Sequence, residues 1–386
     1  MTRFKRLLRP ALKIALGGAG VLALLVGALV VWLLVQRNRA VTLPAPTSPY
    51  AVGRAAYDWV DPAREDPFAP PGTRRELLVW VWYPAAPAPG AAPALYLLEP
   101  FARLRDREPW SLFSQRPQAI RVHAVAEAPV AAAPDRFPIL VFEPGLGRAP
   151  VDYTTLAEEL ASHGYVVAGI FPTASTEVVF PDGRVARSVD AARDAMVPDQ
   201  LIALWSGDAR FALDRLTALN AEAGGRFAGR LDLARVGVFG HSFGGATAAE
   251  ACRLDRRCKA GADLDGTPYG PVARSVLPQP FLFVRGDEGW DPEERPAMAA
   301  IMRSAPTGHG AIMIRGARHF NFADTAVTFA PMARPLGVLG PIDGARGLRI
   351  VAAYLEAFFD HALNGADAPL LAGPSPAYPE VEFLAP

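Results

Sequence analysis

The stretch RVGVFGHSFGGATAAEACRL, residues 235–254, places one serine between a run typical of a strand and a run typical of a helix. Gly240, Ser242 and Gly244 form the pattern G-x-S-x-G, in which a strained strand-to-helix turn lifts a serine hydroxyl out of the backbone. Glycines flank the serine because the turn brings neighbouring chain too close for side chains. Ser242 is therefore the candidate nucleophile, and the helix that begins at Phe243 directs free backbone amides toward an oxyanion.

The segments around this stretch alternate between predicted strands and predicted helices. Apolar and β-branched runs predict strands at 75–85, 137–145, 165–170, 235–239, 259–264, 280–286 and 311–316, and amphipathic runs predict helices at 151–164, 199–220, 244–254 and 347–363. This alternation implies right-handed crossovers and a largely parallel sheet with helices on both faces. Ligands of such sheets bind beyond the carboxyl ends of the strands, which is where Ser242 is expected.

A serine hydroxyl needs a base to remove its proton, and in this type of fold the base follows the serine and an acid along the chain. The sequence has six histidines, at 123, 163, 241, 309, 319 and 361. Three of them, His309, His319 and His361, follow Ser242. His241 directly precedes the serine, and we expect it to pack beside the turn. His319 follows the predicted strand 311–316 at its carboxyl end, whereas His309 precedes that strand and His361 lies in the last helix. The sequence therefore predicts His319 as the base.

Two aspartates are candidates for the acid that orients the base. Asp265 ends the predicted strand 259–264, and Asp287 ends the strand 280–286, so both lie at the same edge as Ser242. Position alone does not choose between them. Three other aspartates that follow the serine, Asp263, Asp291 and Asp324, are predicted to be structural. Asp324 is expected to brace the loop that carries His319.

Four segments together, VFGHSFGGATAAE, KAGADLDGTPYG, LPQPFLFV and IRGARHFNFADTA, resemble the plasma-type platelet-activating-factor acetylhydrolases, a family related to bacterial lipases and polyester hydrolases. The similarity covers roughly residues 75 to 365. It implies an α/β-hydrolase fold and a serine esterase that cleaves short acyl esters such as the sn-2 acetyl groups of phospholipids. By resemblance, the acid is Asp265, the base is His319, and the oxyanion donors are the backbone amides of Leu146 and Phe243. Where the family usually has a histidine before GLG, this chain has Pro144.

Two other functions stay open at this point. A broad carboxylesterase or polyester hydrolase would use the same residues without a preference for lipids. A non-catalytic binding domain on the same fold would lack one of the three catalytic residues, and this sequence supplies all three. In the insertion at about 95–135, Trp110, Leu112 and Phe113 fit either the border of an acyl pocket or ordinary core.

The N-terminus predicts a membrane anchor. Five basic residues precede 22 uncharged residues from Ile14 to Val35, which at about 1.5 Å per residue reach roughly 33 Å and match a hydrocarbon core of about 30 Å. This segment is longer than the apolar part of a cleaved signal peptide and does not end in small residues. The stronger positive charge before it predicts a cytoplasmic N-terminus and an exported remainder. We expect a single-pass anchor at 1–37, a proline-rich linker at 38–50 and a catalytic domain at 51–386.

The composition of the chain limits the kinds of molecule that it is expected to bind. The 39 basic and 39 acidic residues balance and are scattered, which gives no footprint for nucleic acid. We expect a small-molecule ester or phospholipid as substrate, and neither a metal nor an organic cofactor, because the serine chemistry needs none. An exported domain permits a disulfide between Cys252 and Cys258, but the helix geometry leaves its formation open.

Overall fold

A single large sheet forms the centre of the computed structural model, which describes residues 2–107, 109–192, 198–287, 294–304, 310–329 and 333–384. In the described part of the chain this sheet has ten strands, in the order β14 (Val381–Phe383), β13 (Gly310–Ile314), β12 (Phe281–Gly286), β11 (Cys258–Leu264), β10 (Leu231–His241), β6 (Phe137–Glu143), β7 (Val166–Phe171), β3 (Arg74–Ala85), β2 (Ala51–Glu65) and β5 (Val125–Ala126). From β13 to β7 neighbouring strands are parallel. The pairs β14–β13, β7–β3 and β3–β2 are antiparallel, and the short β5 pairs parallel with β2. The predicted, largely parallel sheet is confirmed.

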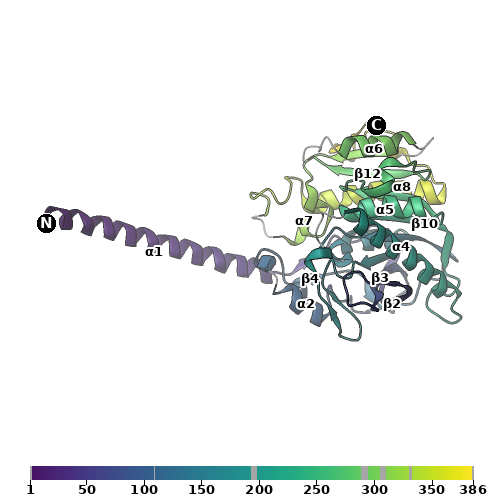
Figure 1. Cartoon of the computed structure of the whole chain (residues 1–386), viewed down its shortest axis with the longest axis horizontal. Helices are drawn as coiled ribbons and strands as arrows, with labels where there is room; N and C mark the ends of the chain where they lie inside the picture. The colour runs from purple at the N-terminus through teal and green to yellow at the C-terminus, as the bar shows by residue number, and fades with distance from the viewer. Residues whose placement is uncertain are drawn as a thin grey trace.

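Helices cover both faces of this sheet (Figure 1). The described helices are α1 (Thr2–Asn38), α2 (Glu99–Arg105), α3 (Thr154–Ser162), α4 (Pro198–Ala221), α5 (Phe243–Leu254), α6 (Glu294–Ser304), α7 (Thr325–Thr328) and α8 (Gly344–Asn364). Alternate residues of β6 point to opposite faces, so that Leu140 packs with α3 and α8 while Val141 packs with α4 and α5. Burial on both faces explains why the central strands are continuous apolar runs.

The sequence prediction differs from the structure mainly at the edges of the sheet. The long strand β2 was not predicted, because polar residues and Pro62 interrupt its apolar pattern. The segment 38–50, predicted as a linker, lies on the domain: β1 (Val41–Thr42) pairs with β4 (Ile120–Arg121), and Leu43 is buried. Cys252 and Cys258, left open by the sequence, form a disulfide.

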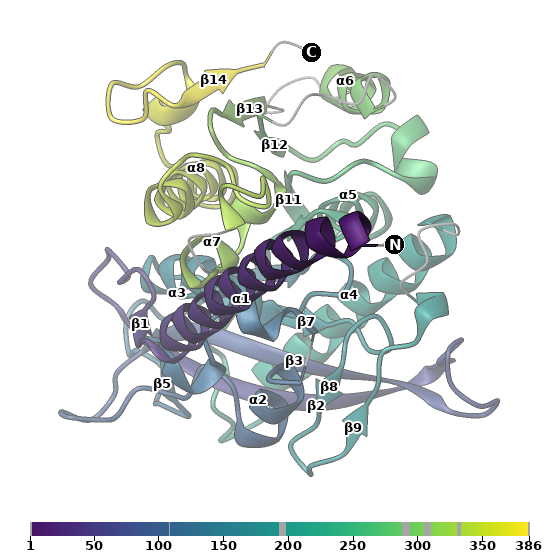
Figure 2. The ribbon, with the colours of Figure 1, turned by 90° about the vertical axis from the view of Figure 1, so that its left-hand side faces the viewer.

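The insertion at about 95–135 contains regular elements that the sequence did not show. It holds α2, the 3₁₀ helix η1 (Pro109–Phe113), and the short strands β4 and β5. Helix η1 packs against α1, the long N-terminal helix that leaves the domain on one side (Figures 1 and 2). The backbone of η1 therefore lies at the base of α1. This helix includes Trp110, Leu112 and Phe113, the three residues considered above as the border of an acyl pocket.

Candidate active site

Ser242 stands at a strained turn between β10 and α5. Its φ of 57° and ψ of −123° lie in a region that side-chain-bearing residues rarely adopt. The flanking glycines are required sterically: a Cβ on Gly240 would overlap the carbonyl of Gly244, and a Cβ on Gly244 would overlap the carbonyl of Glu143. The Ser242 amide donates to the carbonyl of Leu264 at 2.8 Å, which fixes the turn beside the end of β11. The local sequence thus folds into the elbow that the G-x-S-x-G pattern predicts.

Three side chains from three strand ends form a hydrogen-bonded chain at this turn. The Oγ of Ser242 lies 3.0 Å from Nε2 of His319, and Nδ1 of His319 lies 2.7 Å from Oδ2 of Asp265. Because a carboxylate only accepts, Nδ1 of His319 donates to Asp265, and Nε2 is the ring nitrogen placed to accept from the serine hydroxyl. The arrangement is the one in which a base activates a serine nucleophile while an acid orients the base.

The surroundings of Asp265 favour its ionised form. Its side chain is mostly buried, and burial alone would raise its pKa; the bonds from His319 and from the Gly286 amide at 2.9 Å, with the charge of Arg285, outweigh burial and lower the pKa of Asp265. Asp287, the other acid that the sequence left open, is exposed and accepts from the Gly316 amide at 2.5 Å. Asp265, and not Asp287, lies beside the His319 ring.

The other histidines and aspartates weighed from the sequence lie elsewhere. His123 contacts the carbonyl of Leu43 at 2.9 Å, and His361 contacts the carbonyl of Ala366 at 2.8 Å, beyond the end of α8. Asp263 accepts from the Gly266 amide at 2.6 Å, and Asp324 accepts from the Thr155 amide at 3.2 Å, so it fastens the segment after His319 to α3. His309 and Asp291 lie outside the described residues.

His241, expected only to pack beside the turn, links two parts of the site. Its Nε2 lies 2.9 Å from the carbonyl oxygen of His319, so Nε2 carries the proton and donates. Its Nδ1 then accepts from the Tyr153 hydroxyl at 2.8 Å, and that hydroxyl accepts from the Gly145 amide at 3.2 Å. Burial, with repulsion from His319, holds the pKa of His241 well below its usual value, so the ring is neutral. The bonded chain joins the turn at residues 145–147 to the loop of His319.

Sequence reasoning did not find Tyr153. It stands in the 3₁₀ helix η3 (Pro150–Tyr153) just before α3, where an aromatic residue is typical of ordinary core packing. Its ring does pack in the core, against Phe142. Only the position of its hydroxyl, between Gly145 and His241, shows the second role.

The predicted oxyanion donors lie on either side of the serine. Leu146 follows β6 in the turn 144–147, and Phe243 is the first residue of α5, where a helix has unpaired amides. In the part of the chain that the structure describes, neither amide donates to a protein acceptor. The side chains of both residues pack with one apolar cluster, in which the rings of Trp205 and Phe243 meet edge to face at 5.0 Å. An apolar wall therefore borders the two amides.

A neutral carboxyl group lies beneath the elbow. Glu143 ends β6 with 0 % of its surface exposed. Burial, with repulsion from Asp208, raises its pKa well above the usual value, which favours the protonated carboxyl. It therefore adds no negative charge beneath the serine.

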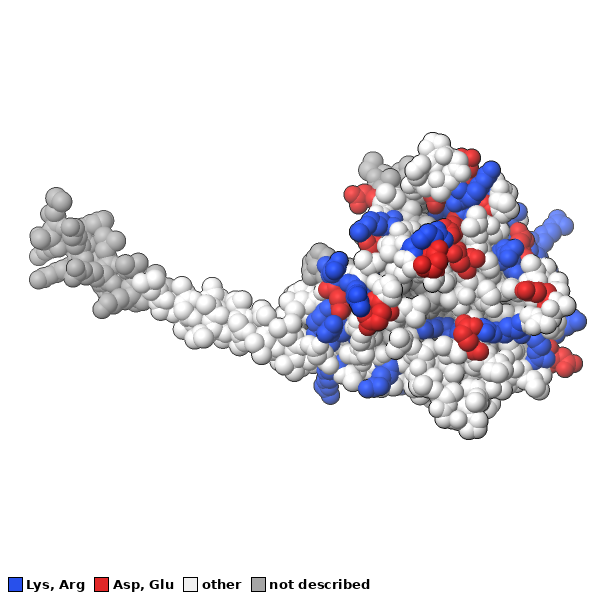
Figure 3. Space-filling view, turned by 90° about the horizontal axis from the view of Figure 1, so that it is seen from below, with Lys and Arg blue, Asp and Glu red and all other residues white. Residues whose placement is uncertain are grey.

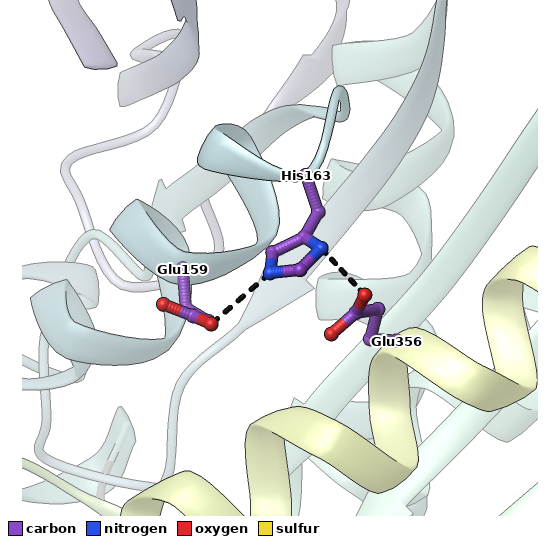
Figure 4. Close-up of side chains that lie close together, drawn as sticks. All are labelled: Glu159, His163 and Glu356. Atoms are coloured by element: carbon purple, nitrogen blue, oxygen red, sulfur yellow. Dashed lines mark hydrogen bonds and ion pairs between the residues drawn. The ribbon is translucent and has the colours of Figure 1, made fainter. Parts of the chain in front are cut away.

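A separate cluster of titratable groups lies at the carboxyl end of α3. His163 stands between Glu159 and Glu356, with ring nitrogens 3.1 Å and 2.5 Å from the two carboxylates (Figure 4). The three groups have the residue types of a metal site. Both nitrogens of the ring already face carboxylates, and Glu159 also accepts from the Thr47 amide at 2.9 Å. Charge pairing across α3 and α8 accounts for the cluster.

Comparison with known proteins identifies the family. The family model of platelet-activating factor acetylhydrolase, isoform II, matches residues 105–172 and 220–367. The chain belongs to this family. Its matched segments contain Ser242, Asp265, His319 and both predicted oxyanion residues, whereas α1 and the strands before residue 105 lie outside them.

Two relatives and one solved structure agree with this assignment. The chain is 27% identical over 273 residues to a probable 1-alkyl-2-acetylglycerophosphocholine esterase of Arthroderma benhamiae, covering 64% of this chain and 66% of that protein. It is 25% identical over 272 residues to the platelet-activating factor acetylhydrolase of Cavia porcellus, covering 64% and 62%. The alignments thus span less than two thirds of either relative. A ferulic acid esterase from Streptomyces cinnamoneus superimposes with a TM-score of 0.78 at 32% identity, over 89% of this chain and 99% of that one. The fold is that of the α/β-hydrolases.

Proposed function

We propose that this chain is a serine carboxylic ester hydrolase whose nucleophile is Ser242. The observation that carries the proposal is the bonded chain from Ser242 through His319 to Asp265 at the carboxyl edge of a parallel sheet. A non-catalytic binding domain would have no use for a strained serine hydrogen-bonded to an imidazole that an acid orients. The family membership supports the same reading.

The proposed reaction follows from the geometry. Ser242 Oγ attacks the ester carbonyl carbon while Nε2 of His319 takes the hydroxyl proton, and the carbonyl oxygen becomes an oxyanion that accepts from the amides of Leu146 and Phe243. Collapse expels the alkoxide, which receives the proton from His319, and leaves an acyl-serine. Water, deprotonated by His319, then attacks the acyl carbon, and the proton returns to Ser242 as the carboxylic acid leaves. Asp265 offsets the charge of the imidazolium in both steps.

For the substrate, we propose a short acyl ester, such as a phospholipid with an acetyl group at sn-2. The names of the Arthroderma benhamiae and Cavia porcellus relatives carry this choice. The apolar wall of Leu146, Trp205 and Phe243 beside the oxyanion amides suits an acyl group. The substrate itself is a small molecule or lipid, and the proposed chemistry uses the protein's own groups without a cofactor.

A broad-specificity carboxylesterase is the second candidate. The solved ferulic acid esterase favours it, since that enzyme matches nearly its whole length to this chain. Such an enzyme would use the same three side chains but accept an aromatic acyl group against the apolar wall. The two candidates therefore differ in acyl specificity and not in mechanism.

An acyl-chain series separates the candidates. We would assay the full chain in detergent with p-nitrophenyl esters from acetate to long chains, a phospholipid with sn-2 acetyl, and methyl ferulate, beside Ser242→Ala. Activity on short acyl groups that extends to the phospholipid supports the acetylhydrolase-like function, and preference for methyl ferulate or no chain-length preference supports the second. Equal activity in the alanine variant, or none in either protein, would overturn the esterase proposal.

We also propose that α1 anchors the protein in a membrane with the catalytic domain exported. The described helix includes a stretch from Leu16 to Asn38 that is long and apolar enough to span a bilayer. The basic residues before it favour a cytoplasmic N-terminus. The base of the helix has specific partners on the domain, which supports an uncleaved anchor over a signal peptide.

A further inference from the structure

The last turns of α1 are packed into the catalytic domain. Leu33, within the apolar stretch, has only 3% of its surface exposed. The Arg37 guanidinium forms an ion pair with Asp106 at 2.7 Å, and the Arg37 carbonyl accepts from the Arg116 amide at 2.9 Å. The helix therefore does not end in a free linker, and its direction is set by the insertion at about 95–135.

The same insertion is fastened to the edge of the sheet that carries the catalytic residues. Arg105 pairs with Asp152 at 2.8 Å, in the loop after β6. Farther along, the Gln115 amide donates to the carbonyl of Thr328 at 3.1 Å, and Thr328 lies in α7, directly after the loop of His319. Protein contacts thus connect the base of α1 to both sides of the active site.

The views of the whole chain place α1 and this edge on one side of the domain. Helix α7 lies on the side from which α1 leaves (Figure 1), and both face the viewer when the molecule is turned (Figure 2). The segment after α7 belongs to this edge, because the Arg318 side chain donates to the Gly337 carbonyl at 2.6 Å. Its Leu336 is an apolar side chain with 66% of its surface exposed.

Charge at the base of α1 suits a phospholipid surface. Residues 37–39 and 99–121, which include the last residues of α1 and the insertion around η1, hold seven arginines and three acidic residues. Charged side chains gather where α1 joins the domain (Figure 3). Part of this positive charge is paired within the protein, with Asp106, Asp152 and Glu99. If α1 spans the bilayer, its stretch of 23 residues from Leu16 to Asn38, about 35 Å long at about 1.5 Å per residue, brings the remaining excess of positive charge to the level of the lipid phosphates.

We propose that α1 holds the catalytic edge of the domain against the bilayer in which it is embedded, so that Ser242 receives ester lipids directly from the adjacent leaflet. The occupant of this face is the lipid surface itself. The proposal rests on the esterase function and the membrane anchor proposed above. Beyond those two proposals, α1 also sets the orientation of the active site relative to the membrane.

Energy transfer to the membrane tests the orientation without using activity. The two native cysteines form a disulfide, so a single introduced cysteine is the one free thiol of the chain. In one variant of the full chain, Leu336→Cys carries a donor dye beside the active-site loop. In the other, Asp135→Cys carries the dye at an exposed position before the amino end of β6. Both are placed in vesicles of phosphatidylcholine and phosphatidylglycerol that carry an acceptor dye on the lipid headgroups. We expect severalfold higher transfer from position 336 than from 135. Equal transfer, or higher transfer from 135, would overturn the proposal.

A variant at the base of α1 tests the consequence for catalysis. Asp106→Ala removes the partner of Arg37 and Arg116, whereas Glu99→Ala removes an exposed ion pair with Arg103 on α2 and serves as the matched control. We expect Asp106→Ala to lower hydrolysis of a short-acyl phospholipid in the same vesicles severalfold, to leave p-nitrophenyl acetate hydrolysis unchanged and to reduce the difference in transfer between the two labels.

The outcomes separate this proposal from the esterase proposal. Equal losses on both substrates in Asp106→Ala, or no loss on the vesicle substrate, contradict the orienting role of α1. Failure of the wild-type chain to cleave either substrate contradicts the esterase function, while the energy-transfer result still tests the orientation.

Discussion

At the scale of single residues, the choice between two aspartates is the sharpest test of the site. Asp265 accepts from His319, whereas Asp287 accepts from backbone at Gly316. We expect Asp265→Asn to lower kcat for p-nitrophenyl acetate by about 10⁴-fold, because an amide favours the wrong tautomer of the base. Asp287→Asn keeps its backbone position and is expected to lose little activity. The reverse ranking would show that the acid has been misassigned.

Tyr153 offers a test of the bonded chain that joins the oxyanion turn to the His319 loop. Tyr153→Phe keeps the ring that packs on Phe142 but removes the bonds to Gly145 and His241. We expect kcat to fall by about tenfold to a hundredfold, since small displacements of catalytic groups are costly, with KM nearly unchanged. A rise in KM at constant kcat would show that Tyr153 acts in substrate binding and not in positioning.

The sequence predicts the catalytic residues better than the residues that hold them in position. Ser242 and His319 follow from a local motif and from chain order, both of which depend on neighbours in sequence. The sequence alone left Asp265 and Asp287 equivalent, because both end strands at the same edge, and the family resemblance was needed to choose. Tyr153 and the linking role of His241 depend on distances between segments far apart in the chain, which no local pattern reports.

At the scale of elements, the buried ion pair of Arg75 on β3 and Asp208 on α4 joins the sheet to a covering helix. Arg75 has 0% of its surface exposed and Asp208 1%, and they meet at 2.6 Å. We expect Asp208→Asn to lower the free energy of unfolding by about 1–3 kcal/mol, because it removes the charge of one of the two carboxylates that pair with the buried guanidinium, while Asp66 at 2.9 Å remains. Chemical denaturation of the full chain in detergent measures the change.

The control for this variant is Glu99→Gln, in the exposed pair with Arg103. A surface pair contributes about 0–1 kcal/mol, so the control is expected to unfold nearly like the wild type. A loss in Asp208→Asn no larger than in Glu99→Gln would contradict the role given to the buried pair.

His163 gives the packing of α3 on α8 a dependence on pH. Burial would lower its pKa, but its bonds to Glu159 and Glu356 outweigh burial and raise the pKa to about 9. A raised pKa stabilises the folded chain fully below the unfolded value of about 6.5 and the stabilisation is lost as the pH rises through about 9. We expect His163→Gln to have a lower Tm than the wild type at pH 6 and the same Tm above pH 9, by differential scanning fluorimetry. A Tm difference independent of pH would contradict the ion pairing.

The elements themselves were predicted where the pattern is strong and local. The central strands were found because burial on both faces makes them apolar runs, and α4 and α8 because their apolar residues recur at helical spacing. Strand β2 was missed, since polar residues and Pro62 interrupt its apolar pattern. The insertion was not folded from sequence, because α2 and η1 take their positions from α1 and from the catalytic loops, all distant in the chain.

At the scale of the whole molecule, we propose that α1 is a permanent membrane anchor. We expect the full chain to stay in the membrane fraction after alkaline carbonate washing, with the domain open to protease from outside and with its N-terminal residues intact by mass spectrometry. A soluble protein that lacks residues 1–40 would show that α1 is a cleaved signal peptide, and would remove the basis for an oriented active site.

Covalent trapping of the nucleophile tests the assignment of Ser242. The full chain would be treated with a fluorophosphonate probe, digested and searched by mass spectrometry, beside Ser242→Ala and Asp287→Asn. We expect one adduct, on Ser242, present in the Asp287 variant and absent in the alanine variant, with esterase activity lost as the adduct forms. An adduct on another residue with loss of activity, or activity that survives full modification of Ser242, would contradict this assignment.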